Sequence, residues 1–415
     1  MSDRLTSAAG VVCLLLVAFV ACPRELRGKV DRRTVLGGLG LLLVLSLLVL
    51  RTPIAATFGY ANAAVNHLLG FTREGARFVF GELAAESNAF GYVFAFQVLP
   101  TILFFSALMS VLYHVGLMPW IIERGGRFLS RVLRVSGAES FSTVADVFVG
   151  QTEAPLAVRP YVARMTLSEL NACMVAGFAT TAGGVLAAYV SMLSSSVPGI
   201  AGHLIASSVM GAPASLVVAK LMLPESAPTE TGSELVAEHE RPSVNVLDAL
   251  VRGTLDGVRL AVNVAAMILV FLAFTAMFDA LVHGIGGLFG VQLGLTQILA
   301  WAFTPLAFLL GVPTPDVAKV GSLLGQKTVF NEFVAYSTMA AELRRDPAWL
   351  SERGRVIASY ALCGFANFGS IGIQIAGYSS LAPDRLGDLS RLGIRAMLGG
   401  LLATCLVACV AGLFL

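Results

Sequence analysis

Charged residues are scarce in this chain, and their scarcity excludes a water-soluble fold. Only 13% of the 415 residues are charged and 56% are hydrophobic, whereas a soluble globular chain carries about 25% charged residues. The mean hydropathy is +0.80. A single soluble core cannot bury so many apolar side chains, so the lipid bilayer must solvate much of the chain.

The residue patterns of several functional classes are also missing. The net charge is +2, with no polybasic run of the kind that neutralises nucleic-acid phosphates, so no nucleic acid is expected. The six cysteines form no CxxC pair and no Cys/His ligand spacing, which argues against disulfides or zinc. No HExxH, GxSxG, dinucleotide loop or phosphate loop is present. We therefore expect no resident cofactor, and a membrane-embedded enzyme using Glu153 and Glu332 stays only as an alternative to transport.

Apolar runs account for most of the chain. About eight of them approach the roughly 20 residues that span a bilayer: 7–22, 34–50, 93–117, 168–191, 199–223, 259–283, 356–380 and 394–415. The first run ends in Phe19-Val20-Ala21-Cys22, which loosely resembles a lipoprotein cleavage site. Only one arginine precedes it and further spans follow, so we interpret it as the first span.

The distribution of basic residues predicts the orientation. Five Lys and Arg residues lie between the first two runs, and positively charged loops stay in the cytoplasm. Both termini are then expected outside. Four arginines oppose this scheme because it places them outside: Arg344, Arg345, Arg353 and Arg355.

Four segments between the spans are either too polar or too charged to be ordinary transmembrane helices. Residues 52–92 are expected to form interfacial helices, and residues 224–258 a cytoplasmic connector. Two apolar stretches, 141–163 and 318–341, carry charge at their centres, where a carboxylate costs about 2.5–3.5 kcal/mol on insertion scales. We interpret these two stretches as re-entrant hairpins.

An internal repeat follows from these hairpins. The span after each hairpin is interrupted at a similar motif, Gly177-Phe178-Ala179 in one and Gly364-Phe365-Ala366 in the other. One hairpin enters from the cytoplasm and the other from outside, so the repeats are inverted. The predicted fold is an all-α polytopic membrane protein with discontinuous helices, which is typical of secondary transporters. A channel suits paired inverted hairpins less well.

The expected organisation has four parts. Residues 1–117 form scaffold helices and interfacial segments, and residues 118–223 form the first transport-domain repeat. Residues 224–283 form the connector and a scaffold span, and residues 284–415 form the second repeat.

The first hairpin carries side chains suited to a flat polar heterocycle. Gln151, Thr152 and Glu153 are consecutive, so a hairpin tip presents an amide, a hydroxyl and a carboxylate together, with Val185 as an apolar contact. Alternatively, these side chains bond one another and close the hairpin.

The second repeat carries side chains suited to a vicinal diol. Glu332, Asn367 and Ser370 offer a carboxylate, an amide and a hydroxyl from two elements, and a sugar ring fits that set. Phe365 is placed to pack against the sugar, unless it is simply a core residue. An ion pair between Glu332 and Lys327 is the alternative for the carboxylate.

A cation requires several oxygen atoms with little net charge, which unwound backbone supplies. The candidates are the carbonyls around Asp146 and Val149 in the first hairpin, and Thr180 and Thr181 at the first helix break.

Several motifs together resemble the concentrative nucleoside transporter family in its bacterial form. The resemblance covers roughly residues 95–415. It rests on VGQTEAPL (149–156), VRPY (158–161), APAS (212–215), GQK (325–327), NEFVAY (331–336) and SYALCGFAN (359–367).

The resemblance implies eight spans, two re-entrant hairpins and a homotrimer in the cell (inner) membrane. It implies symport of a nucleoside with a cation, sodium or alternatively a proton, and leaves uptake of a nucleobase or another polar solute as the runner-up. The family's contacts fall on Gln151, Thr152, Glu153 and Val185 for the base, on Glu332, Asn367, Ser370 and neighbouring Phe365 for the ribose, and on Asp146, Val149, Thr180 and Thr181 for sodium.

The chain departs from the family pattern around the cation. The family commonly has Asn at position 146, Ile at 181 and Ser at 184, where this chain has Asp146, Thr181 and Gly184. The family's contact at position 146 is mainly through backbone. We therefore favour a bystander role for the Asp146 side chain, in which Asp146→Asn leaves sodium-driven uptake nearly unaltered. The alternative is that its carboxylate points at the cation and either tightens sodium binding or titrates and lets a proton substitute.

Overall fold

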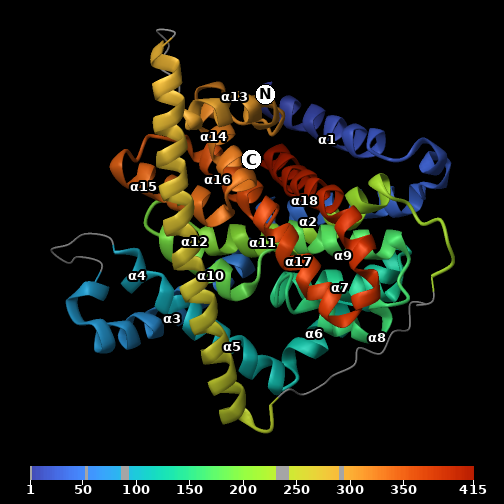
Figure 1. The fold of residues 1–415 in the computed structure, drawn as a ribbon, viewed down its shortest axis with the longest axis horizontal. Helices are drawn as coiled ribbons and strands as arrows, with labels where there is room; N and C mark the ends of the chain where they lie inside the picture. The colour runs from blue at the N-terminus through green and yellow to red at the C-terminus, as the bar shows by residue number, and fades with distance from the viewer. Residues whose placement is uncertain (1, 52–54, 86–92, 230–242, 289–293) are drawn as a thin grey trace.

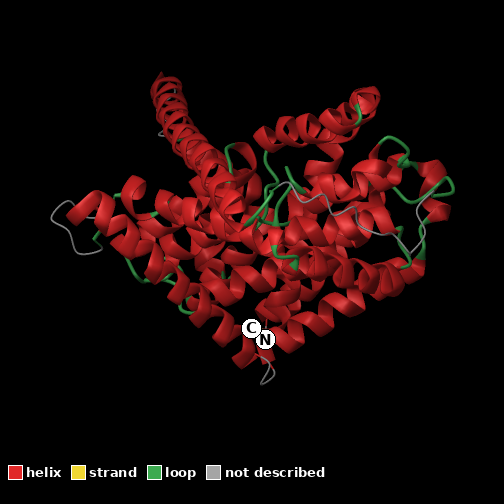
Figure 2. Cartoon of the chain, turned by 90° about the horizontal axis from the view of Figure 1, so that it is seen from below, coloured by secondary structure: helices red, strands yellow, loops and turns green. Residues whose placement is uncertain are grey.

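The computed structural model describes residues 2–51, 55–85, 93–229, 243–288 and 294–415. Within these ranges every regular element is a helix (Figures 1 and 2). The connector predicted at 224–258 and the segment 52–92 lie partly outside the described residues. Within the latter, residues 55–80 form one long helix, α3.

Two series of helices follow the first three helices, α1 (Ser2–Val20), α2 (Arg32–Arg51) and α3 (Ala55–Phe80). The first series contains α4 (Phe94–Gln97), α5 (Leu99–His114), α6 (Leu117–Leu133), α7 (Gly137–Phe148), η3 (Ala154–Val158), α8 (Arg159–Val162), α9 (Leu167–Ala179), α10 (Gly183–Leu193) and α11 (Ile200–Met222). The second contains α12 (Val246–Leu288), α13 (Leu295–Leu309), α14 (Val317–Val329), α15 (Glu332–Arg345), α16 (Glu352–Leu362), α17 (Phe368–Leu381) and α18 (Leu386–Phe414). The inverted repeat and its boundaries, 118–223 and 284–415, stay a prediction.

Seven helical stretches of the described residues are long and apolar enough to cross a membrane. They are Asp3–Val20, Arg32–Arg51, Phe94–His114, Leu167–Leu193, Ile200–Met222, Val246–Gly284 and Pro383–Phe414, and each corresponds to a predicted run. The eighth predicted run, 356–380, is divided between α16 and α17. Gly364 interrupts it with a φ of +135°, a conformation that L side chains rarely adopt.

The helix α12 forms one side of the molecule. It contains 43 residues, roughly 65 Å at 1.5 Å per residue, and in Figure 1 it crosses the view from top to bottom with α5 packed along its lower part. By contrast, α1 packs mainly against α18, and α2 against α11. The two termini lie side by side in both views (Figures 1 and 2), where Arg4 donates to the Leu415 carbonyl at 2.6 Å.

Three of the four arginines that oppose the predicted orientation are held by internal carbonyls. The bonds are Arg344 Nη1 to Met192 O (3.4 Å), Arg353 Nη2 to Gly412 O (2.8 Å) and Arg355 Nη1 to Ser196 O (3.0 Å). These carbonyls lie at the C-terminal ends of α10 and α18, which attract cations. These three arginines therefore have a structural role, and the predicted orientation stays a prediction.

Candidate functional site

The two helix breaks lie against each other at the centre of the molecule. A Cβ added to Gly364 would lie 2.8 Å from the Phe178 carbonyl oxygen, and Thr181 Oγ1 lies 3.5 Å from Cys363 Sγ. The two Gly-Phe-Ala motifs are offset, because the first is still helical at the end of α9 and the second is inside the break. The fold thus brings the predicted half-sites together.

In the first half-site, Gln151 reaches across to the second repeat. Its Nε2 donates to Ser370 Oγ at 3.3 Å, and its Oε1 accepts from Gln374 Nε2 at 3.1 Å. Gln151 and Val185 are buried, whereas Thr152 and Glu153 are exposed. The Gln151 amide therefore bonds the opposite repeat rather than its own hairpin neighbours.

In the second half-site, each Glu332 carboxylate oxygen accepts one hydrogen bond. Tyr189 donates to Oε1 and Asn367 Nδ2 donates to Oε2, both at 3.0 Å. Glu332 is the first residue of α15, and Asn367 caps α17 by accepting from the Ser370 amide at 2.9 Å. The carboxylate thus lies near two helix N-termini, whose partial positive charge favours an anion.

The alternative ion pair with Lys327 does not form. Lys327 Nζ donates instead to Ala361 O at 2.8 Å and to Thr404 Oγ1 at 3.1 Å. Phe365 is almost fully buried at the second break. The carboxylate of Glu332 thus depends on neutral donors.

The four candidate cation residues lie where the first hairpin tip meets the first break. A Cβ on Gly150 would lie 2.6 Å from Ala182 Cβ, so tip and break are in contact. The Thr180 hydroxyl donates to Ala176 O at 2.9 Å, and the Thr181 carbonyl accepts from Ser208 Oγ at 3.4 Å. The oxygen-rich set fits a hard monovalent cation in type, since such ions prefer oxygen ligands.

Sequence reasoning missed two side chains of this site. Gln374 donates to Gln151, and Tyr189 donates to Glu332 while its ring stacks on Tyr336 with centroids 4.4 Å apart. Gln374 lies four residues after Ser370 and Tyr189 four residues after Val185, so both occupy the same helix faces as predicted residues. That periodicity was the signal available in the sequence.

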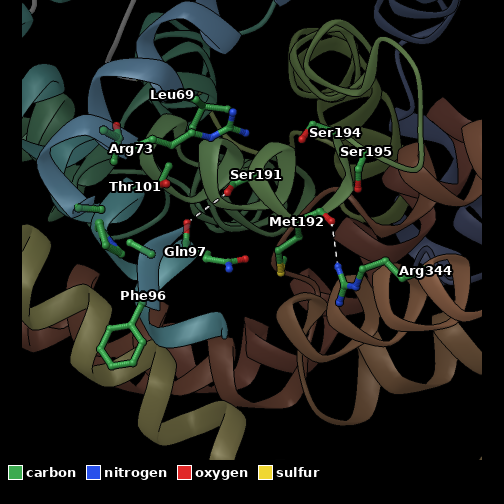
Figure 3. A pocket seen from close by; sticks show the side chains of 14 residues that line it. Leu69, Arg73, Phe96, Gln97, Thr101, Ser191, Met192, Ser194, Ser195 and Arg344 are labelled. Atoms are coloured by element: carbon green, nitrogen blue, oxygen red, sulfur yellow. Dashed lines mark hydrogen bonds between the residues drawn. The ribbon is translucent and has the colours of Figure 1, made fainter. Parts of the chain in front are cut away.

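A cavity of about 380 Å³ lies beside the half-sites, between α3, α4 and α5 on one side and α10 and α15 on the other. Arg73 and Arg344 lie on opposite sides of it, and Ser191 on α10 donates to Gln97 O at 3.3 Å (Figure 3). None of the predicted substrate residues lines this cavity. The cavity therefore lies between α3, α4 and α5 and the helices α10 and α15.

Family models match nearly the whole chain. The model described as "Na+ dependent nucleoside transporter N-terminus" matches residues 9–83, "Nucleoside recognition" matches 95–196, and "Na+ dependent nucleoside transporter C-terminus" matches 203–412.

Relatives of similar length and longer ones both align along the chain. An "Uncharacterized transporter" of Haemophilus influenzae is 42% identical over 415 residues, with 99% of this chain and 98% of that protein covered. "Sodium/nucleoside cotransporter 1" of Rattus norvegicus is 40% identical over 426 residues, with 99% of this chain covered. The chain spans 64% of that rat protein.

Solved structures agree with the fold. CNTnw in an inward-facing substrate-bound state has a TM-score of 0.92 and 43% identity, with 99% of this chain and 98% of that chain covered. A CNTnw double variant in an outward-facing state has a TM-score of 0.93 and 42% identity, with 100% and 98% covered.

Proposed function

The chain belongs to the concentrative nucleoside transporter family, and we propose on that basis that it carries nucleosides into the cell together with sodium by alternating access. It is a multi-pass cell-membrane protein and a transporter rather than an enzyme. The contact that joins Gln151 of one repeat to Ser370 and Gln374 of the other supports the proposal, because it joins the two half-sites into one.

The two half-sites divide recognition of the substrate. Gln151, Thr152 and Glu153 with Val185 read the base, and Glu332, Asn367 and Ser370 bind the ribose hydroxyls beside Phe365. Glu332 suits this role because its oxygens are already oriented by Tyr189 and Asn367, and an oriented carboxylate accepts strongly from hydroxyl donors.

Sodium supplies the work for uptake. We assign it to the first repeat, where Asp146, Val149, Thr180 and Thr181 are the candidate ligands. One sodium ion moving inward gains about 2.3 kcal/mol per 100 mV, and a tenfold sodium gradient adds about 1.4 kcal/mol. One ion per nucleoside therefore permits accumulation by a few hundred-fold.

The helix packing suggests which helices form the moving transport domain and which form the fixed scaffold. Residues 118–223 and 284–415, with their re-entrant hairpins, form the transport domain, and α5 and α12 are the scaffold. Within 1–117, α1 and α2 pack against α18 and α11, so we assign these two helices to the moving part. A homotrimer, as the resemblance implies, would hold the scaffold in place.

The test is uptake of labelled uridine and adenosine into proteoliposomes under imposed sodium or proton gradients. Sodium-driven uptake is expected, with ribose alone failing to compete. Uptake driven only by a proton gradient would show that the coupling ion is a proton rather than sodium. Failure of every nucleoside under either gradient would reject the function in favour of transport of another polar solute.

A further inference from the structure

Gln374 on α17 is a buried amide that bonds two groups from the first half of the chain. Its side chain is 0% exposed, and its Nε2 donates to Gln151 Oε1 and to the Met174 carbonyl oxygen, both at 3.1 Å. Met174 lies on α9, which packs against α17 (Figure 1). One nitrogen atom therefore links the proposed base-reading side chain to the backbone of a helix.

The Met174 carbonyl decides the orientation of the Gln374 amide. The oxygen and nitrogen of a glutamine amide differ little in size, so its hydrogen-bond partners determine which atom lies where. A backbone carbonyl can only accept, so the nitrogen of Gln374 must face Met174. The side chain keeps this orientation although its Oε1 accepts from no described residue. The opposite orientation would place two acceptor oxygens against each other.

The orientation of Gln374 in turn fixes that of Gln151. Because the Gln374 nitrogen is a donor, Gln151 must turn its oxygen toward Gln374 and its nitrogen away. One N–H of the Gln151 nitrogen donates to Ser370 Oγ at 3.3 Å, and the other has no acceptor among the described residues. Gln151 therefore offers a ligand a donor rather than an acceptor.

Gly177 of α9 leaves room for these two amides. A Cβ added there would lie 2.6 Å from Gln374 Nε2 and 3.0 Å from Gln151 Cβ. A larger residue would therefore displace the nitrogen that links Gln151 to Met174. Gln374 also lies four residues after Ser370, so both side chains that contact Gln151 share one face of α17. The packing of the two helices thus supports the orientation of the Gln151 amide.

We propose that Gln374 is a positioning residue for base recognition, which fixes the Gln151 amide with its N–H toward the base and so selects nucleosides whose base presents an acceptor there. This inference rests on the proposed function and deepens it, because it names the chemical feature by which the site distinguishes one nucleoside from another. Gln374 acts through Gln151 and needs no contact with the substrate.

Uridine and cytidine form the pair that tests this selection. Uracil has a donor at N3 and an acceptor at O4, whereas cytosine has an acceptor at N3 and a donor at its 4-amino group. Whichever of these two positions faces Gln151, the two nucleosides present opposite groups to it. We expect their affinities for the parent chain to differ about tenfold, because a donor that faces a donor leaves a buried group unpaired. If only purine nucleosides bind, inosine and adenosine replace this pair, since their bases differ in the same way.

Two variants of Gln374 should change the affinity ratio in different ways. Gln374→Met keeps an unbranched side chain but removes the donor, so the Gln151 amide can rotate and the ratio should fall toward one. Gln374→Glu keeps the shape of the side chain. The Met174 carbonyl takes its O–H when it has one, so the oxygen that faces Gln151 is an acceptor in either protonation state. Gln151 should then turn its N–H toward position 374 and its oxygen toward the base, and the preference should invert.

The measurement is equilibrium binding of labelled uridine and cytidine to the full chain in detergent with NaCl present, with Tm recorded for each variant. The matched control is Gln326→Met. Gln326 is a buried amide on α14 that donates to Ser322 Oγ at 3.2 Å and accepts from Thr338 Oγ1 at 2.8 Å. Its loss should lower Tm and leave the affinity ratio unchanged. A merely structural role for Gln374 would likewise lower Tm and weaken both nucleosides equally.

Equal affinities of the parent chain for the two nucleosides would overturn the inference. A ratio in Gln374→Met or in Gln374→Glu that equals the ratio of the parent chain would overturn it as well, and if Gln374→Glu does not fold, Gln374→Met decides. Failure of the parent chain to bind any nucleoside rejects the proposed function. Nucleoside binding with a ratio that does not depend on Gln374 rejects only the positioning role.

Discussion

The two half-sites contain similar kinds of side chain but differ in how these are satisfied. In the second repeat, Glu332 accepts from Tyr189 and Asn367, and Lys327 donates to the Ala361 carbonyl and the Thr404 hydroxyl. In the first, Asp146 accepts from no described residue, and α10 begins without a side-chain cap. The second half-site is thus preorganised by the protein, while the first keeps a buried carboxylate without a donor among the described residues.

Removal of the central carboxylate of the preorganised half should have the largest effect. Glu332→Ala is expected to weaken nucleoside binding about ten- to a hundredfold, because a hydrogen bond to a charged group contributes about 1.5–3 kcal/mol. Titration calorimetry of purified protein with uridine checks it, and Asn367→Ala should act in the same direction. Unchanged uridine affinity would refute the assignment of the sugar to this half.

Removal of the buried Lys327 ammonium tests how much it stabilises the second half-site. Lys327→Met leaves Ala361 O and Thr404 Oγ1 without their donor, so the free energy of unfolding should fall by about 1–3 kcal/mol, measured as a lower Tm that sodium does not restore. Lys319→Met on the same helix, where the ammonium is only half-buried, should cost less. Equal Tm values for Lys327→Met and the parent chain would show that the ammonium is not a structural cation.

Loss of one donor to Glu332 should have a smaller effect. Tyr189→Phe keeps the ring stacked on Tyr336 and deletes only the hydroxyl that donates to Oε1. We expect about tenfold weaker nucleoside binding, in equilibrium binding with labelled uridine. An affinity equal to that of the parent chain would mean that Asn367 alone orients the carboxylate.

The smallest expected effect belongs to the base-reading amide, where a neutral hydrogen bond contributes about 0.5–1.5 kcal/mol. Gln151→Ala should weaken binding by a factor of about two to ten and alter the ranking among uridine, cytidine and adenosine. Competition assays across the three nucleosides measure that ranking. A uniform loss for all three would contradict the division of labour between the repeats.

Much of the fold was predictable from local patterns. Seven predicted runs coincide with helices long enough to cross a membrane, because bilayer length and apolar composition are local properties. The helix breaks were also predictable, since Gly364 needs a conformation that glycine alone adopts easily. The one-turn offset between the two Gly-Phe-Ala motifs was not, because packing of one break on the other decides where each helix ends.

The candidate site was predictable as a set of residues but not as a set of contacts. The motifs containing Gln151 and Glu332 are short, so their functional side chains can be recognised from the sequence alone. Their partners are distant: Gln374 lies 223 residues from Gln151, and Tyr189 lies 143 residues from Glu332. Local periodicity places Gln374 and Tyr189 on the right helix faces but does not show which distant residue each one contacts. For the same reason the sequence did not show which groups Lys327 and Asp146 would contact.

The sequence by itself determined that this chain enters a membrane, that its helices are interrupted twice, and which polar side chains occupy the interruptions. Only the tertiary structure decided which of these groups meet. The physical reason is that the energy of a buried charge depends on its neighbours rather than on its identity. Lys327 and Asp146 are both buried, and Lys327 donates to nearby acceptors while the Asp146 carboxylate accepts from no described residue.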